Sequence, residues 1–301
     1  MAAIPSTVEA SQELLISELP EQSSLGQDAW RRLRRNRLAV VGLVIIVIFL
    51  VTALVSLVWT PYPTWRQALG TTYAGPSLGH PLGLDDYGRD ILSRVMGGAA
   101  IALAVGVGAS FLASMTGIIL GMLAGFFKGK VDALISLIIN IFYGVPDLLV
   151  ALILVVLIGR GLFNIILAIA LTGWLGMARL VRGQTLSIRE REYVEAARTI
   201  GTPNAMILTR HILPNALGPI IVQATYLVPA AIIFEAFLSL LGLGIPPPSP
   251  SWGAMASEGY KALQIAPHIV LAPCAALSLT VLAFNWLGDG LRDAIDPRMR
   301  R

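Results

Sequence analysis

The chain has 301 residues, of which 55% are hydrophobic and only 13% charged, with a formal net charge of +4. A soluble domain carries about 25% charged residues, so this composition excludes an ordinary soluble protein. No basic soluble domain offers a face for nucleic acid, and the single cysteine excludes an intrachain disulfide or a paired-cysteine metal site.

The apolar segments are long and continuous. Residues 95–127 and 262–288 contain no Asp, Glu, Lys or Arg, and a transmembrane helix needs about 20 mostly apolar residues. Barrel strands would instead give short alternating segments. The sequence therefore predicts an all-α polytopic membrane protein with six transmembrane helices. Their expected ranges are 39–59, 98–127, 132–158, 162–180, 215–241 and 267–288.

The first 38 residues precede these spans. Residues 1–25 are rich in Ser, Glu and Gln, which is typical of a disordered tail. The basic cluster begins only near residue 31, so the segment does not have the pattern of a cleavable signal. We therefore divide the chain into a cytoplasmic N-terminal tail with a basic juxtamembrane part, residues 1–38, and a transmembrane domain, residues 39–301.

The positions of Lys and Arg predict the orientation in the membrane. With the N-terminus inside, the inner segments hold 17 of the 22 Lys and Arg residues, and the outer segments hold 5. Such a bias toward one side is typical of cytoplasmic loops. We expect a multi-pass protein of the cell inner (cytoplasmic) membrane with both termini in the cytoplasm.

This orientation gives two long external loops, 60–97 and 242–266. The first contains LGLDDYGRDILSR, in which Asp85 and Asp86 suit a turn or a helix N-cap. The second opens with GLGIPPPSPSWG, and its prolines predict a stiff, extended connection. The sequence leaves open whether these are simply ordered loops or also contact a substrate or partner.

Two acids interrupt the predicted spans. Asp147 lies about 15 residues, or roughly 22 Å of helix, beyond Asp132, and Gly144 and Pro146 before it predict a broken helix. An acid at this depth usually faces a bundle interior or an aqueous cavity. Asp147 therefore either lines a translocation path or caps the second half-helix. Glu235 lies near the outer end of the fifth span, where we expect it to reach headgroups or water.

A polar island, EYVEAARTIGTPNAMILTRHILPN (192–215), follows the fourth span on the predicted cytoplasmic side. Its first helix should end at Gly201, the residue type that commonly supplies a left-handed C-terminal position. Thr202 can cap a second helix with Pro203 at its first position, and Pro214 is expected to end it. Such a pair of short helices is either a docking element for a cytoplasmic partner or an amphipathic loop on the lipid headgroups.

The island resembles the EAA motif of the membrane subunits of bacterial ATP-binding-cassette (ABC) importers. That pattern is Glu-Ala-Ala, three residues, Gly, nine residues, Ile, one residue and Leu-Pro. The chain departs from it at the Ile position, where it has His211. The matching residues are Glu195, Ala196, Ala197, Gly201, Leu213 and Pro214. The resemblance implies that 192–213 is the element that couples the membrane subunit to its ATPases.

Other stretches are similar to the dipeptide and oligopeptide permease family, and most of all to its C-type membrane subunits. They include GLDDYGRDILSR (83–94), with Leu84 where the family has Thr, FEAFLSLLGLG (234–244) and NWLGDGLRDAIDP (285–297). The resemblance implies a type I ABC importer permease fold and uptake of oligopeptides or dipeptides. The implied partners are a homologous second permease subunit, two cytoplasmic ATPase subunits, an external peptide-binding protein and the lipid bilayer.

The chain has no Walker A motif, since GFFKGKVD (125–132) has the wrong glycine spacing and no Ser or Thr after the Lys. We therefore expect no enzyme activity, cofactor or metal site in this chain, with ATP and Mg bound by the partner ATPases. Two alternatives remain at this stage. One is a related importer for nickel or another small solute, and the other is a proton-coupled secondary transporter that uses Asp147 and Glu235.

Overall fold

The computed structural model describes residues 25–295, and within them the chain forms helices and loops. Six membrane-crossing segments follow one another in the order that the sequence predicts. Five are helices long and apolar enough to cross a membrane, and the sixth is a bent pair, α5 and α6. The elements are α3 (Arg37–Ser56), α4 (Ile91–Phe127), α5 (Gly129–Tyr143), α6 (Asp147–Ile158), α7 (Leu162–Arg189), α10 (Leu213–Leu240) and α12 (His268–Ile295).

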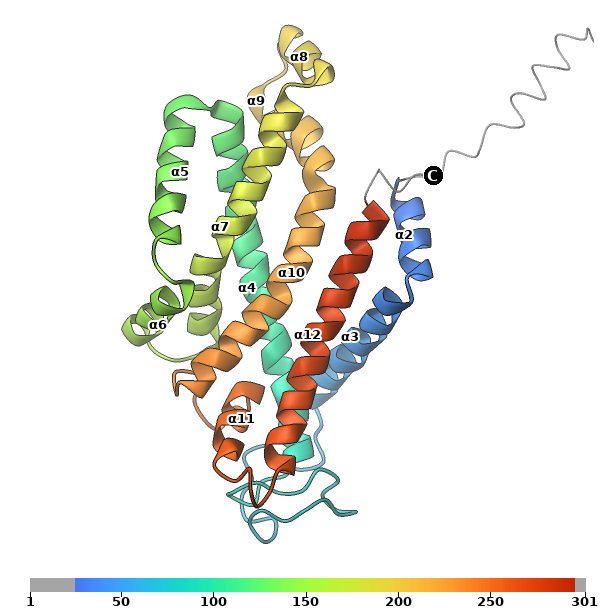
Figure 1. The fold of residues 1–301 in the computed structure, drawn as a ribbon, viewed down its shortest axis with the longest axis vertical. Helices are drawn as coiled ribbons and strands as arrows, with labels where there is room; N and C mark the ends of the chain where they lie inside the picture. Colours follow the sequence, from blue (N-terminus) through green and yellow to red (C-terminus); the bar gives the residue numbers. More distant parts are fainter. Residues whose placement is uncertain (1–24, 296–301) are drawn as a thin grey trace, which may run out of the picture.

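The segments run in alternating directions and give the molecule two ends (Figure 1). One end carries α8 (Glu192–Thr199) and α9 (Asn204–Ile207), together with α2 (Leu25–Arg35) and the last turns of α12. We call this the α8 end. The other carries α11 (Trp252–Tyr260) and the long loop between α3 and α4, and we call it the α11 end. The proposed tail of residues 1–25 lies almost entirely outside the described residues.

Helix α4 begins earlier than the sequence predicts, at residue 91 rather than 98. Asp90 supplies the cap, because its side chain accepts a hydrogen bond from the backbone N–H of Ser93 at 2.8 Å. At about 1.5 Å per residue, the 37 residues of α4 span roughly 55 Å. The helix is therefore longer than a bilayer core and extends into the loops of the α11 end.

Glycines allow α4 and α7 to pack closely. Gly117, Gly121 and Gly125 recur every four residues along one side of α4, which is the small-residue spacing typical of membrane helix pairs. A Cβ atom at Gly121 would lie 2.5 Å from the carbonyl oxygen of Ala178 on α7. The two backbones thus approach to a distance that a larger residue at this position would prevent. Near the α8 end, Arg182 of α7 also donates two hydrogen bonds to the carboxylate of Asp132 on α5.

The predicted break in the third span is present. Helix α5 ends at Tyr143, α6 begins at Asp147, and the two axes differ by 89°. Pro146 stands just before α6, where its missing N–H leaves no helical hydrogen bond unmade. The break therefore turns α6 sideways relative to α5, as Figure 1 shows.

Helix α11 lies inside the loop that the prolines predict to be extended, and a turn at residues 247–248 already interrupts the loop before this helix, so the prediction of an extended connection is wrong. Ser251 caps the helix by accepting a hydrogen bond from the N–H of Ala254. Trp252 is buried and donates its indole N–H to the carbonyl oxygen of Val95 at the start of α4. These contacts bring the second loop against the first one.

Two arginines link the loops further. Arg94, which is 4% exposed, donates to Asp85 and to Glu258 of α11. Arg89 donates to the same two carboxylates, at 2.6 Å and 2.8 Å. Both loops are therefore ordered parts of one structure at the α11 end.

The expectation for Glu235 is wrong. Its side chain is 1% exposed and accepts a hydrogen bond from the hydroxyl of Ser239 at 2.7 Å. The Ser239 hydroxyl also lies 3.2 Å from that of Ser251, the cap of α11. Glu235 does not reach headgroups or water, because α11 folds back over this part of α10.

Candidate functional site

The polar island forms a helical hairpin at the α8 end. Helix α8 is followed by Gly201, whose φ of +79° is the left-handed conformation that the sequence predicts. The N–H of Thr202 bonds to the carbonyl of Ala197 at 3.0 Å, and the N–H of Gly201 to that of Arg198 at 2.9 Å. These two bonds define a Schellman C-cap, which fixes the direction of the chain after α8.

The second half of the hairpin differs from the prediction in two respects. Pro203, and not Thr202, is the residue that precedes α9, and no side chain caps this helix. Pro214 does not end the helix, because α9 continues through the π-helical turn η1 (Leu208–Ile212) into α10. The chain thus passes Pro214 through a π turn with its wider hydrogen-bond spacing, and Pro214 stands just after that turn, in the first turn of α10.

The inner side of the hairpin is packed into the rest of the protein. Val194 and Ala197 of α8 are buried, as are Ile207 and Ile212 from the second half. They form one cluster with Phe126 at the end of α4 and with residues of α7 and α10. The hairpin is thereby attached to three membrane-crossing helices.

The outer side of the hairpin is exposed. Glu195 and Ala196 lie on it, and Ile200 at the turn is 82% exposed. Nothing lies within 4 Å of the position that a Cβ at Gly201 would take. A protruding apolar side chain beside small residues and an open turn forms a surface that another protein can cover closely.

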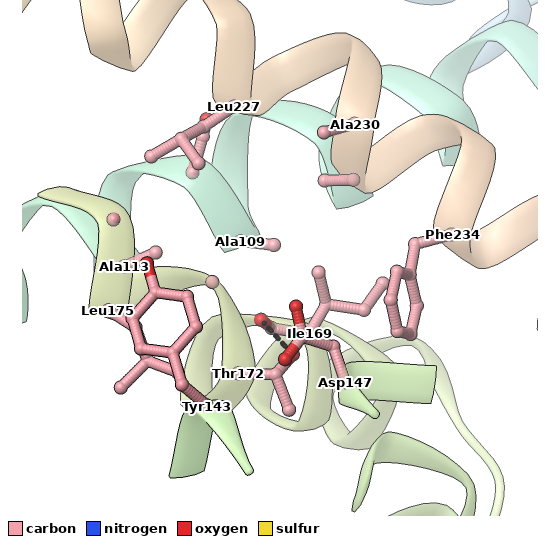
Figure 2. Close-up of a pocket in the computed structure, with 14 residues that line it drawn as sticks. Ala109, Ala113, Tyr143, Asp147, Ile169, Thr172, Leu175, Leu227, Ala230 and Phe234 are labelled. Carbon is pink, nitrogen blue, oxygen red and sulfur yellow. Dashed lines mark hydrogen bonds between the residues drawn. The ribbon is translucent and has the colours of Figure 1, made fainter. Parts of the chain in front are cut away.

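A second region of interest is a cavity of about 250 Å³ between helices (Figure 2). Helices α4, α7 and α10 and the junction between α5 and α6 supply its walls. Asp147 and Tyr143 belong to its lining, and both are exposed. Phe234 and Leu227 contribute apolar surface from α10.

Asp147 does not cap α6. The helix has no side-chain cap bond, and Asp147 is its first residue. Of the two roles that the sequence leaves open, the structural cap is therefore not supported by the geometry. The carboxylate instead belongs to the lining of the cavity.

The structure thus separates the predicted residues into two sites. Glu195, Ala196, Ala197 and Gly201 lie together in the hairpin, and Leu213 and Pro214 stand at its base, in the first turn of α10. Asp147 lies elsewhere, in the cavity. Ile200, the apolar residue directly before the turn glycine, adds to the outer side of the hairpin. Tyr143 was not among the predicted residues, because only the fold brings it to the cavity.

A group of three carboxylates at the α11 end, those of Asp85, Asp86 and Glu258, has a spacing compatible with a metal ion. Arg89 and Arg94 already donate hydrogen bonds into this group. Their two positive charges occupy the position that a cation would need, so the group is an ion-pair network that joins the two loops.

The fold and the hairpin define a polytopic membrane component of a transport system. The chain matches the family "Binding-protein-dependent transport system inner membrane component" over residues 117–301 and the N-terminal transmembrane domain of oligopeptide transport permease C over residues 24–76. The chain belongs to this family of importer membrane components, which are not themselves enzymes, and it is a multi-pass inner-membrane protein. Membership of an ABC importer family implies partner ATPases and a second permease.

Curated relatives match almost the whole chain. The chain is 43% identical to the oligopeptide transport system permease protein OppC of Bacillus subtilis (strain 168), over 92% of this chain and 91% of that protein. It is 46% identical to the dipeptide permease DppC of the same organism, covering 92% and 87%. It is also 43% identical to the glutathione permease GsiD of Escherichia coli O1:K1 / APEC, covering 90% of each.

A solved structure shares the fold. A chain of the inward-facing MetNI methionine ABC transporter superposes with a TM-score of 0.55 at 20% identity. It covers 68% of this chain and 98% of the MetNI chain. At this level of identity the similarity concerns the fold alone, which is the type I importer permease fold that the sequence predicts.

Proposed function

We propose that the chain is a membrane-spanning subunit of an ABC importer that takes up oligopeptides or dipeptides. The observation that carries this proposal is the similarity over nine-tenths of the chain to permeases named for oligopeptides, dipeptides and glutathione. All three substrates are short peptides. The chain would form the translocation path together with a homologous second permease subunit.

The hairpin 192–213 is the coupling element in this proposal. Its packed inner side transmits a movement to α4, α7 and α10, and its outer side docks on an ATPase subunit. Two such ATPases bind ATP and Mg, and their hydrolysis cycle switches the membrane subunits between outward and inward access. An external peptide-binding protein delivers the substrate to the α11 end.

The same proposal fixes the orientation in the bilayer. Both termini and the hairpin face the cytoplasm, and the loops 60–97 and 242–266 lie outside. Residues 1–38 are the cytoplasmic tail and its basic juxtamembrane part, and residues 39–301 are the permease domain. The distribution of Lys and Arg supports this orientation.

Asp147 lines the translocation path in this proposal. Support comes from its place in the cavity and from the absence of a cap bond at the start of α6. A carboxylate within a membrane-crossing segment is expensive unless it faces water or a polar partner, and a transport cavity supplies water.

The test is uptake of a labelled tripeptide by the assembled transporter, together with copurification of the ATPases. Glu195→Lys reverses a charge on the outer side of the hairpin, and Gly201→Val places a Cβ at a φ of +79°, which costs about 1–2 kcal/mol. We expect both variants to lose uptake and ATPase binding. Gly201→Asn is the matched control, because asparagine tolerates this conformation.

Normal uptake by both Glu195→Lys and Gly201→Val would refute the coupling role. Uptake of nickel or another small solute, but not of peptide, would refute the peptide assignment. Uptake that survives removal of ATP and follows a proton gradient would indicate the secondary transporter instead.

A further inference from the structure

Three of the four polar side chains that line the cavity beside Asp147 can only accept hydrogen bonds from a ligand, and the fourth is Tyr143, whose hydroxyl can also donate. The hydroxyl of Thr172 donates to the carbonyl oxygen of Ile169 at 3.0 Å (Figure 2, dashed line). The hydroxyl of Ser110 donates to the carbonyl oxygen of Gly106 at 2.9 Å. Each hydroxyl has one hydrogen to donate, so both now offer only lone pairs to a ligand. The Asp147 carboxylate, when ionised, is also an acceptor only. These two hydroxyls and the carboxylate can therefore all accept hydrogen bonds from a ligand that carries donors.

No cation of the described residues satisfies this carboxylate. The ion pairs of residues 30–295 do not include Asp147. Arg179 stands near the cavity, but its guanidinium lies 4.1 Å from the centre of the Tyr143 ring and donates to the side chain of Asn140. The Asp147 carboxylate is therefore available to a cation from outside the chain.

The rest of the lining limits the size and character of that ligand. Small residues from α4, α7 and α10 make the wall beside the acceptors, and Ile169, Leu227 and Phe234 make an apolar part. Pockets for drug-sized ligands measure about 300–1,000 Å³, so a cavity of about 250 Å³ suits a single amino-acid residue rather than a whole peptide. The lining thus fits a small ligand with a cationic head and an apolar side chain.

We propose that this cavity receives the first residue of the translocating peptide, with its α-ammonium group on the Asp147 carboxylate. An ammonium has three donors and no acceptor, which complements the carboxylate and the two hydroxyls. The first side chain lies against the apolar part of the wall. The inference rests on the proposed uptake of peptides, and it assigns to the permease a selectivity of its own for a free peptide N-terminus.

The experiment uses the assembled permease–ATPase complex without the external binding protein. Ala230 lies in the cavity wall and is exposed, so Ala230→Cys in a Cys274→Ser background reports occupancy through its rate of labelling by a maleimide. The probes are one tripeptide with a free N-terminus and the same tripeptide with an acetylated N-terminus. Peptide uptake by the complete transporter is measured in parallel for every variant.

We expect the free tripeptide to protect the cysteine at a concentration about tenfold lower than the acetylated one, the size of a single charge-assisted hydrogen bond. Adding Asp147→Asn should abolish the difference. The matched control is Asp293→Asn, an exposed carboxylate on α12 outside the cavity lining, and it should preserve the difference.

Equal protection by both peptides in the Asp147 protein would overturn the inference, and so would protection by neither while uptake is intact. A uniform loss of uptake in Asp147→Asn with unchanged selectivity would indicate that Asp147 pairs with a cation of the second permease instead. Failure of the unmodified transporter to take up any peptide would refute the proposed function itself.

Discussion

Asp85 and Asp86 are neighbours in the chain, but they differ in burial and in the number of hydrogen bonds that they accept. Asp85 is 3% exposed and accepts hydrogen bonds from Arg89, Arg94 and two backbone N–H groups. Asp86 is partly exposed and has one long hydrogen bond, 3.4 Å from Arg89. We expect Asp85→Asn to destabilise the protein by about 3–5 kcal/mol, the cost of breaking a buried ion pair, and Asp86→Asn to cause no loss. Thermal unfolding of the purified transporter measures both.

The two substitutions should also differ in their dependence on pH. Burial and the neighbouring Asp85 carboxylate raise the pKa of Asp86 above its ordinary value. The pKa of Asp86 is therefore higher in the folded state than in the unfolded state. At a pH between these two values the folded state binds more protons, so this carboxyl makes stability fall as pH rises through that window. Asp86→Asn should remove that decrease. An unchanged pH profile in Asp86→Asn would show that this carboxyl does not titrate in that way.

Glu235 joins α10 to the cap of α11 through two serine hydroxyls. Glu235→Ala leaves the buried hydroxyl of Ser239 without its acceptor, and we expect the free energy of unfolding to fall by about 1–3 kcal/mol. Glu235→Gln keeps an acceptor oxygen in place and should lose less. The midpoint of thermal unfolding compares the two variants with the unmodified protein. An equal effect of both substitutions would contradict the hydrogen-bonding role and point to the charge.

At the scale of helices, close packing of α4 against α7 depends on single glycines. A Cβ at Gly121 would lie 2.5 Å from a backbone oxygen, which cannot move aside without shifting α7. We expect Gly121→Ala to destabilise the protein by about 1–3 kcal/mol, as overpacking commonly does. The matched control is Gly173→Ala, whose Cβ would meet only the Ala113 methyl at an ordinary 3.5 Å. Equal unfolding midpoints for both variants would contradict this explanation.

The elements differ in how far the sequence predicts them. The spans follow from long uncharged runs, and the break before Asp147 follows from Gly144 and Pro146, because both signals are local. Helix α11 has only nine residues, too few for an apolar run, and Ser251 was its one local signal. The continuation of α9 into α10 depends on a π-helical turn, which has no strong residue preference of its own.

The two candidate sites also differ in whether local sequence signals predict them. The hairpin was predictable because its residue types act locally, such as a glycine at the turn and small residues beside it. The cavity was not, because it needs Tyr143 and Asp147 at a bend together with walls from three other helices. Only Asp147 had a signal in the sequence, its charge inside an apolar span. The other lining residues, with Ser110 and Thr172 among them, lie within apolar spans and have no signal of their own until the fold brings them together.

At the scale of the whole molecule, the ion-pair network at the α11 end and the packed hairpin at the α8 end lie at opposite ends of the bundle (Figure 1). Both are ordered by contacts with the same long helices, since α4 carries Arg94 near its first turn and Phe126 at its last. In the proposed transporter, α4 therefore provides a direct mechanical connection between the delivery side and the ATPase side.

The proposed orientation of these two ends gives the final prediction. A reporter that is active only outside the cytoplasm, placed at the end of chains truncated after Arg66 or Ser257, should be active, since both positions belong to the α11 end. Truncation after Lys128 or Arg198 places the reporter at the α8 end, and it should be silent. The physical reason is the excess of Lys and Arg in segments of the α8 end, which are retained in the cytoplasm. A cytoplasmic reporter should give the reverse pattern in the same four fusions and excludes differences in expression. Activity of the external reporter after Arg198 would place the hairpin outside the cell, where no ATPase can reach it, and would overturn the coupling proposal along with the orientation.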